Sequence, residues 1–321
     1  LMLCAGCPGE GDAPAAGKTS VVATLFVLYD FARQVGGEDV TVSLLIPPGA
    51  EPHSFEPSPR DVVAVRKADV FFYGGKAMDP WAERLVAQTS GKGPVIADAS
   101  RGIELLYAGE AHVHGDEGNH HEASPGDGID PSGGDQDRGH ADPHFWLDPV
   151  RALTMVDTIR DALTAADPAH GASYAERARV LKNELKALDE EIRHTLARRI
   201  GNIIIFGGHN MWRYFAARYG LEFLSPYPGF SPEAEPQGRR LVELTELMRT
   251  RGLSVIYHEE RIDPKTARVL AEATGARLEV LHGAHNVSPE EIEAGVSYIS
   301  LMKENLATLQ TDPGLFPDSA E

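Results

Sequence analysis

The chain has 321 residues, of which 42% are hydrophobic and 24% are charged, as in an ordinary globular protein. This length exceeds that of one typical domain and predicts two. The formal net charge of −18 argues against a nucleic-acid-binding protein, which needs a basic surface. The longest apolar run, from Val21 to Tyr29, is too short to span a membrane, which argues against a channel or permease.

The first residues resemble the end of an export signal. The two cysteines, Cys4 and Cys7, both lie there, so a disulfide framework or a cysteine-based zinc finger is not expected. Ala5-Gly6-Cys7 resembles the end of a bacterial lipobox, in which small residues precede a cysteine that is lipidated. We expect residues 1–17 to be a signal remnant and flexible tether, with a lipid on Cys7 holding the protein in the periplasm or on the cell surface. The alternative is an exported protein whose signal peptide is removed without lipidation.

Strand-like and helix-like runs alternate from residue 18 onward. Ser58-Pro59 offers a helix N-cap followed by proline at the first helical position. The alternation is typical of parallel βαβ units and predicts an N-terminal α/β lobe over residues 18–168. The pattern predicts strands at Val21–Leu25, Val40–Leu45, Val70–Tyr73 and Val95–Ala97, and helices at Phe26–Val35, Arg60–Lys67 and Pro80–Ala87.

An acidic, histidine-rich segment interrupts this lobe at residues 109–143 and predicts an irregular loop. Helical periodicity returns at Val150–Ala166, stops at Asp167-Pro168, and resumes over residues 169–199. The second run carries one apolar stripe and is long enough to connect two lobes. The stripe consists of Tyr174, Ala178, Leu181, Leu185, Leu188 and Ile192.

Residues 200–321 repeat the α/β pattern and predict a C-terminal lobe. The fold class expected for the whole chain is therefore α/β, with two α/β lobes containing parallel sheets and joined by a long rigid helix. In the C-terminal lobe we expect strands at Asn202–Phe206, Leu221–Leu224, Leu253–Tyr257 and Arg277–Leu281. The helices expected there are Met211–Tyr219, Glu235–Arg251, Pro264–Thr274 and Pro289–Leu309.

Histidines follow the carboxyl ends of strands in both predicted lobes. His53 follows Val40–Leu45, His209 follows Asn202–Phe206, and His282 and His285 follow Arg277–Leu281. Ligands of open α/β sheets bind beyond such strand ends, so a cleft between the lobes would gather these side chains. His144 lies between the acidic loop and the next helix. Four nitrogen ligands suit Zn²⁺, whereas Mg²⁺ and Ca²⁺ prefer oxygen.

Several segments resemble the cluster A-I metal-binding proteins of bacterial ABC importers, which carry zinc or manganese. The resemblance covers roughly residues 18–312, and its most specific segment is Asp-Pro-His-Phe-Trp-Leu-Asp-Pro at 142–149. Residues 52–59 resemble the family segment with the first histidine ligand, residues 209–221 the segment with the third, and residues 297–306 the last helix. The resemblance implies metal ligands at His53, His144 and His209, two lobes on a rigid helix, and delivery of the metal to a membrane permease.

The sequence departs from this family at the fourth ligand. Most members have a carboxylate after the penultimate strand, but here His282 occupies that place and His285 follows three residues later. The resemblance thus implies His282 as the fourth ligand, with His285, a carboxylate or water as alternatives. A site of histidines without a carboxylate favours zinc over manganese. We expect Glu259, Glu260 or Asp263 to orient the imidazole rings.

These observations together predict a monomeric binding protein that captures Zn²⁺ between its lobes and passes it to an ABC permease. A further weak zinc site is expected on residues 112–140, because His-rich tracts bind metal without a packed core. The alternatives are a manganese- or iron-binding member of the same family, a zinc-dependent hydrolase, and an adhesin. A hydrolase is disfavoured, because His258-Glu259-Glu260 lacks the His-Glu-x-x-His spacing and no nucleophile elbow or phosphate loop is present.

Overall fold

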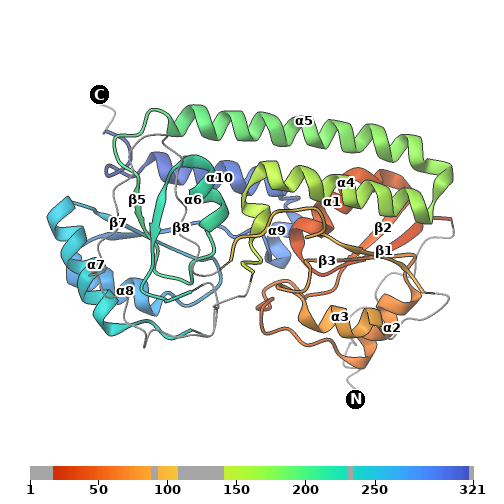
Figure 1. Cartoon of the computed structure of the whole chain (residues 1–321), viewed down its shortest axis with the longest axis horizontal. Helices are drawn as coiled ribbons and strands as arrows, with labels where there is room; N and C mark the ends of the chain where they lie inside the picture. Colours follow the sequence, from red (N-terminus) through yellow and green to blue (C-terminus); the bar gives the residue numbers. More distant parts are fainter. Residues whose placement is uncertain (1–16, 88–92, 108–140, 230–233, 318–321) are drawn as a thin grey trace, which may run out of the picture.

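The structure of the chain is a computed structural model that describes residues 17–87, 93–107, 141–229 and 234–317. It forms two α/β lobes that lie side by side beneath one long helix (Figure 1). The predicted fold class is therefore confirmed. The signal remnant, Cys7 and most of the 109–143 loop, with its expected zinc site at 112–140, lie outside the described residues.

The N-terminal lobe contains a four-stranded parallel sheet in the order β2-β1-β3-β4. Helix α2 begins where the sequence predicts, because Ser58 and Asp61 form a reciprocal capping box around Pro59. The strands are β1 Thr19–Ala23, β2 Val40–Leu44, β3 Val70–Tyr73 and β4 Val95–Asp98. The helices are α1 Phe26–Gly36, α2 Pro59–Lys67 and α3 Pro80–Ala87, with a short 3-10 turn, η1, at Gly37–Asp39.

The C-terminal lobe contains two parallel strand pairs, β5 with β6 and β7 with β8. A parallel bridge between Phe206 and Tyr257 joins the two pairs. The strands are β5 Ile203–Ile205, β6 Glu222–Leu224, β7 Val255–His258 and β8 Arg277–Val280. The helices are α6 Arg213–Tyr219, α7 Gly238–Arg251, α8 Lys265–Thr274, α9 Pro289–Glu293 and α10 Tyr298–Gln310.

One predicted helix is wrong in extent. The segment expected as one helix, Pro289–Leu309, divides into α9 and α10. Gly295 adopts a left-handed φ of 73°, which ends the first helix, and Ser297 begins the second through a capping box with Ser300. Periodicity misses this break because Ile292 and Val296 both still pack against the core.

The connecting helix α5, Gly171–Leu196, lies along both lobes (Figure 1). Its 26 residues correspond to a length of about 39 Å. It follows α4 (Pro149–Ala166) after the break at Asp167 and the 3-10 turn η3 (Pro168–His170). All six side chains of the predicted stripe are at most 2% exposed. They belong to one apolar cluster that continues from Val21 in the first lobe to Leu315 in the second, so this helix and the core hold the lobes together.

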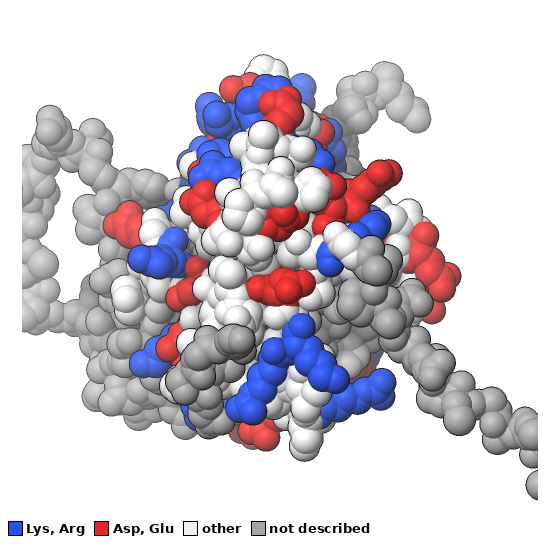
Figure 2. Space-filling model, turned by 90° about the vertical axis from the view of Figure 1, so that its right-hand side faces the viewer, with Lys and Arg blue, Asp and Glu red and all other residues white. Residues whose placement is uncertain are grey.

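The surface carries both signs of charge despite the net charge of −18. Figure 2 shows the end of the N-terminal lobe, where Lys and Arg side chains lie among Asp and Glu side chains on the described part of the face. This mixture offers no extended basic footprint there for nucleic acid. No helix within the described ranges is both long and apolar enough to cross a membrane.

Candidate metal centre

His53 reaches the centre from the loop between β2 and α2. Its backbone N–H donates to Glu51 Oε1 at 3.1 Å. Two residues later, the Phe55 ring packs edge-on against Trp81 with centroids 5.8 Å apart. The glutamate and the aromatic contact hold the loop on both sides of the imidazole.

His144 precedes the 3-10 turn η2 (Phe145–Leu147) and is completely buried. Asp142 Oδ1 accepts two hydrogen bonds from His144, one from its backbone N–H at 3.0 Å and one from its ring Nδ1 at 2.8 Å. A carboxylate that accepts the Nδ1 proton leaves the lone pair on Nε2, which is the nitrogen turned toward the other histidines. Burial raises the pKa of Asp142 to about 7, while the His144 N–H and nearby Arg213 oppose that rise.

His209 follows β5 and is oriented in the same way by Glu259, which follows β7. Its Nδ1 lies 2.7 Å from Glu259 Oε1, and its backbone N–H donates to the same oxygen at 3.2 Å. Gly208 makes this approach feasible, because a Cβ at that position would lie 2.3 Å from Glu259 Oε1. Both side chains are buried, at 3% exposure for His209 and 4% for Glu259.

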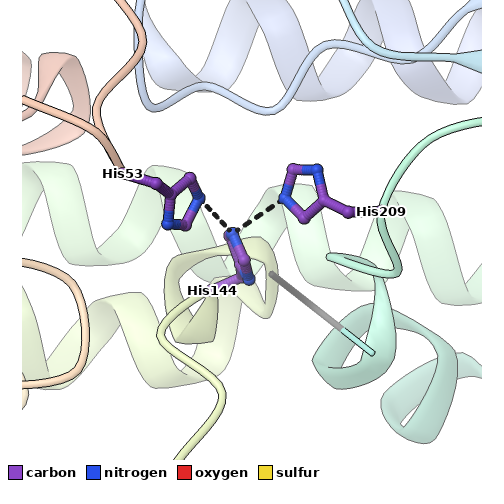
Figure 3. Close-up of side chains that lie close together, drawn as sticks. All are labelled: His53, His144 and His209. Carbon is purple, nitrogen blue, oxygen red and sulfur yellow. Dashed lines mark hydrogen bonds between the residues drawn. The ribbon is translucent and has the colours of Figure 1, made fainter. Parts of the chain in front are cut away.

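The three imidazoles converge on one point between the lobes (Figure 3). His53 Nε2 lies 3.1 Å from His144 Nε2, and His209 Nε2 lies 3.4 Å from the same atom. Two nitrogens at about 2.05 Å from a tetrahedral zinc ion would be roughly 3.3 Å apart, which matches both separations. His144 and His209 each donate a hydrogen bond from Nδ1 to a carboxylate. The Nε2 atom of each ring therefore carries the lone pair, and these lone pairs face one another. Facing lone pairs repel unless a cation or proton lies between them, so the residues present fit a zinc ion.

Burial sets the charge state of these rings. It lowers the pKa of His53 and His144 well below the ordinary histidine value, and the neighbouring imidazoles lower it further. For His209 burial acts in the same direction, but the Glu259 charge and hydrogen bond outweigh it, so that its pKa is raised. Neutral imidazole is the form that binds metal. His53 and His144 are therefore neutral and ready to bind at neutral pH, and His209 is the ring of the three at which protons compete most with a metal as the pH falls.

His282 and His285 both follow β8, but they are placed differently. Of the two, His285 faces the converging rings, with its ring centroid 6.2 Å from that of His53. His282 points toward two carboxylates instead, at 3.5 Å from Glu260 Oε1 and 3.6 Å from Glu291 Oε1. Its Nδ1 accepts the Ala284 N–H at 2.9 Å, which puts the proton on Nε2 and leaves that atom without a lone pair for a metal. Neither ring belongs to the group of side chains whose ligand atoms lie within 4.8 Å of one another, which in the described residues is His53, His144 and His209, so the fourth ligand stays a prediction.

The three acids expected to orient the imidazole rings have different partners. Glu259 contacts His209, while Glu260 accepts the Gly283 N–H at 2.8 Å and Asp263 pairs with Arg268 on the surface. Asp142 is not among the acids expected from the sequence, because it lies at the end of the acidic segment at residues 109–143. Its signal was the spacing Asp-x-His, which lets one carboxylate reach both the backbone N–H and the Nδ1 of the residue two positions later.

Comparison with known proteins decides the family. Residues 21–312 match the family described as ZnuA, zinc-uptake complex component A, periplasmic. The chain belongs to the ZnuA family. It is 34% identical over 314 residues to the zinc-binding lipoprotein AdcA of Streptococcus pneumoniae TIGR4, covering 95% of this chain and 59% of that protein. It therefore spans about three fifths of the length of the AdcA relatives.

A second relative has a more similar length. The high-affinity zinc uptake system protein ZnuA of Bacillus subtilis 168 is 33% identical over 313 residues, with 97% of this chain and 92% of that protein covered. The crystal structure of the Zn(II)-bound ZnuA-like domain of S. pneumoniae AdcA superposes with a TM-score of 0.73 at 32% identity. That superposition covers 92% of this chain and 98% of that domain. The ZnuA fold thus extends over both lobes of this chain.

Proposed function

We propose that this protein binds one Zn²⁺ ion between its lobes and delivers it to an ABC permease for import. The observation that carries the proposal is the convergence of His53, His144 and His209, whose Nε2 atoms have the separations of zinc ligands. The zinc ion is cargo, so the site must both bind it and release it. Membership of the ZnuA family supports this transport role.

The donor set supports zinc over manganese or iron. The three converging ligands are imidazoles, and His285 offers a fourth nitrogen beside them. The two carboxylates at the centre, Asp142 and Glu259, each use one oxygen to contact the Nδ1 atom of His144 or His209. Imidazole ligands suit zinc, whereas manganese prefers carboxylate and carbonyl oxygen.

The same arrangement supports a binding protein over a zinc hydrolase. A catalytic zinc site keeps one coordination position open for water beside a general base. Here a fourth imidazole borders the three ligands, and the nearby Glu259 holds His209 at 2.7 Å. Glu259 Oε1 is therefore engaged as the hydrogen-bond acceptor that orients a ligand.

The proposed site of action is outside the cytoplasm. The family description includes the word periplasmic, and the S. pneumoniae relative is named a lipoprotein. A lipid on Cys7 would keep the protein beside the permease, and the residues around Cys7 match that proposal in sequence. Labelling with a palmitate analogue, with Cys7→Ala as control, tests the anchor.

Zinc uptake in the organism that encodes this chain tests the transport role. Deletion of the gene should lower the uptake of radioactive zinc in zinc-poor medium, and the wild-type gene should restore it. His144→Ala should fail to restore uptake, because it removes the most buried of the three ligands. His194→Ala is the matched control, since His194 is exposed on α5. Full restoration by His144→Ala would refute the proposal.

A further inference from the structure

A small cavity lies between the lobes beside the metal centre. Its volume is about 80 Å³, enough for a few water molecules or a partly hydrated ion. Residues 49–52 of the β2–α2 loop form one wall and residues 260–262 of the β7–α8 loop form the other. His285 and Asn286 complete the lining. The cavity therefore opens where the two lobes meet.

His285 connects this cavity to the converging histidines. Its side chain is 5% exposed, and its Nδ1 is buried without a hydrogen-bond partner. The nearest acidic atom to that nitrogen is Glu260 Oε1 at 3.9 Å, while the ring itself lies beside His53. An ion that entered the cavity would thus meet the side chain of His285, whose ring lies beside His53.

Charged residues line the cavity from both lobes. Glu51 comes from the first lobe and is fixed by the His53 N–H, and Glu260 comes from the second lobe and is fixed by the Gly283 N–H. Arg261 stands beside Glu260 with a left-handed φ of 63°, and its Nη2 pairs with Glu291 Oε2 at 3.0 Å. A dication approaching this opening meets two carboxylates that attract it and one guanidinium that repels it.

A second cavity near the centre lies within the C-terminal lobe. It has a volume of about 60 Å³ and is lined by C-terminal residues that include His209, Glu259 and Lys265. Glu259 lies against Nδ1 of His209, whereas the nitrogen that faces the other ligands is Nε2. This second cavity is lined by residues of the C-terminal lobe alone, whereas the first cavity is lined by residues of both lobes.

We propose that zinc reaches and leaves the histidines through the cavity between Glu51 and Glu260, and that Arg261 sets the rate of this exchange. This inference rests on the proposed function and adds the route of the ion and three residues that control it. The two carboxylates raise the local concentration of the cation and so accelerate its association. The guanidinium of Arg261 opposes them.

Stopped-flow mixing of the full-length protein with Zn²⁺ alone tests the route. Trp146 provides a fluorescence signal, because its ring centroid lies 5.4 Å from that of His144. Glu51→Gln and Glu260→Gln should each slow association by about 3- to 10-fold at low ionic strength, and the difference should shrink in high salt. Arg261→Gln should accelerate association by about 2- to 5-fold. Both glutamines keep an oxygen that accepts the backbone N–H.

The matched controls are Glu176→Gln and Arg179→Gln on α5, where both side chains are 61% exposed. Control variants should associate with zinc at the wild-type rate. Suppose that the wild-type protein binds one zinc, but that the cavity variants associate with zinc at the control rate or change only its dissociation. The proposed route is then wrong, while the zinc-binding function stands. If the wild-type protein binds no zinc, the proposed function fails first. Because Glu51 and Arg261 lie on different lobes and predict opposite signs, misfolding of one variant does not remove the test.

Discussion

His209 and Glu259 form a buried pair that joins the ends of two parallel strands in the C-terminal lobe. The imidazole Nδ1 lies 2.7 Å from Glu259 Oε1, and the same oxygen accepts the His209 backbone N–H. The carboxylate therefore fixes the position, the tautomer and the basicity of this ligand at once. His144 has the same relationship with Asp142 in the other half of the centre.

Glu259→Gln should weaken zinc binding by about 10- to 100-fold near pH 7.5, because the neutral amide holds the imidazole less firmly and makes it less basic. The glutamate raises the pKa of His209, so protons compete with zinc for this ring and the affinity falls as the pH drops through that pKa. In the variant the pKa of His209 is lower, and the fall in affinity should move to lower pH. Competition titrations over a pH series measure both effects.

Asp263→Asn is the control for that experiment, since Asp263 pairs with Arg268 on the surface and does not contact a histidine of the centre. It should leave both the affinity and its pH dependence unchanged. An unaltered pH profile in Glu259→Gln would mean that the carboxylate does not govern the protonation of His209.

The fourth ligand can be assigned by comparing two neighbouring histidines. His285→Ala should reduce zinc affinity by at least about 10-fold, because it removes the imidazole that lies beside His53. His282→Ala should have a much smaller effect, since Nδ1 of His282 already accepts the Ala284 N–H. X-ray absorption spectra of the zinc complexes should show one imidazole fewer in the first variant. The reverse order of effects would restore His282 as the ligand.

Asp30 gives the fold a pH dependence that is independent of the metal. Its carboxylate is 3% exposed and accepts the Tyr298 N–H at the start of α10. Burial raises its pKa from 3.8 to about 6, although the hydrogen bonds oppose that rise. The folded state thus holds a proton that the unfolded state releases, and this group lowers the free energy of unfolding as the pH rises from about 4 to about 6.

Asp30→Asn should remove this dependence. The stability of the variant relative to wild type should increase by up to about 3 kcal/mol between pH 4 and pH 6.5, measured by urea unfolding of the metal-free protein. Asp161→Asn, at a side chain that is 69% exposed, should show a constant difference over the same range. A constant difference for Asp30→Asn as well would refute the buried-charge explanation.

The apolar stripe of α5 should determine the stability of the two-lobed structure. Leu185 is fully buried in the shared core, so Leu185→Ala should lower the free energy of unfolding by about 2–5 kcal/mol. Val180, on the same helix, is 44% exposed, and Val180→Ala should change the free energy of unfolding by less than about 0.5 kcal/mol. Both variants should still bind one zinc ion under native conditions. Equal losses of stability would contradict the assigned orientation of the helix.

Much of the fold follows from local sequence signals. The stripe on α5 and the cap at Ser58 depend on residues close together in the chain, and the structure confirms them. The break between α9 and α10 does not follow from periodicity, because hydrophobic spacing continues across Gly295 while the backbone turns there. The hydrophobic periodicity of a segment indicates which face of a helix is buried, but it does not indicate whether the helix is continuous.

The metal centre, too, could be predicted from the sequence only in part. His53, His144 and His209 were predicted from their places after strands or before a helix, and the structure brings them together. The choice between His282 and His285 depends on how the loop between β8 and α9 folds around Ala284, which adopts a left-handed φ of 55°. Sequence spacing alone does not reveal that turn, nor that it directs one ring to carboxylates and the other to the ligands.

Zinc binding by a chain that lacks residues 112–140 tests the central claim most directly. Tyr107 and Ala141 pair in an antiparallel bridge, so a short linker can replace the deleted segment. Competition titration of this chain should show one zinc ion bound with a sub-micromolar dissociation constant (below about 1 μM). His144→Ala in the same background should weaken binding by at least about 100-fold. Loss of zinc with the loop, or unchanged binding in His144→Ala, would contradict a zinc site at the three histidines.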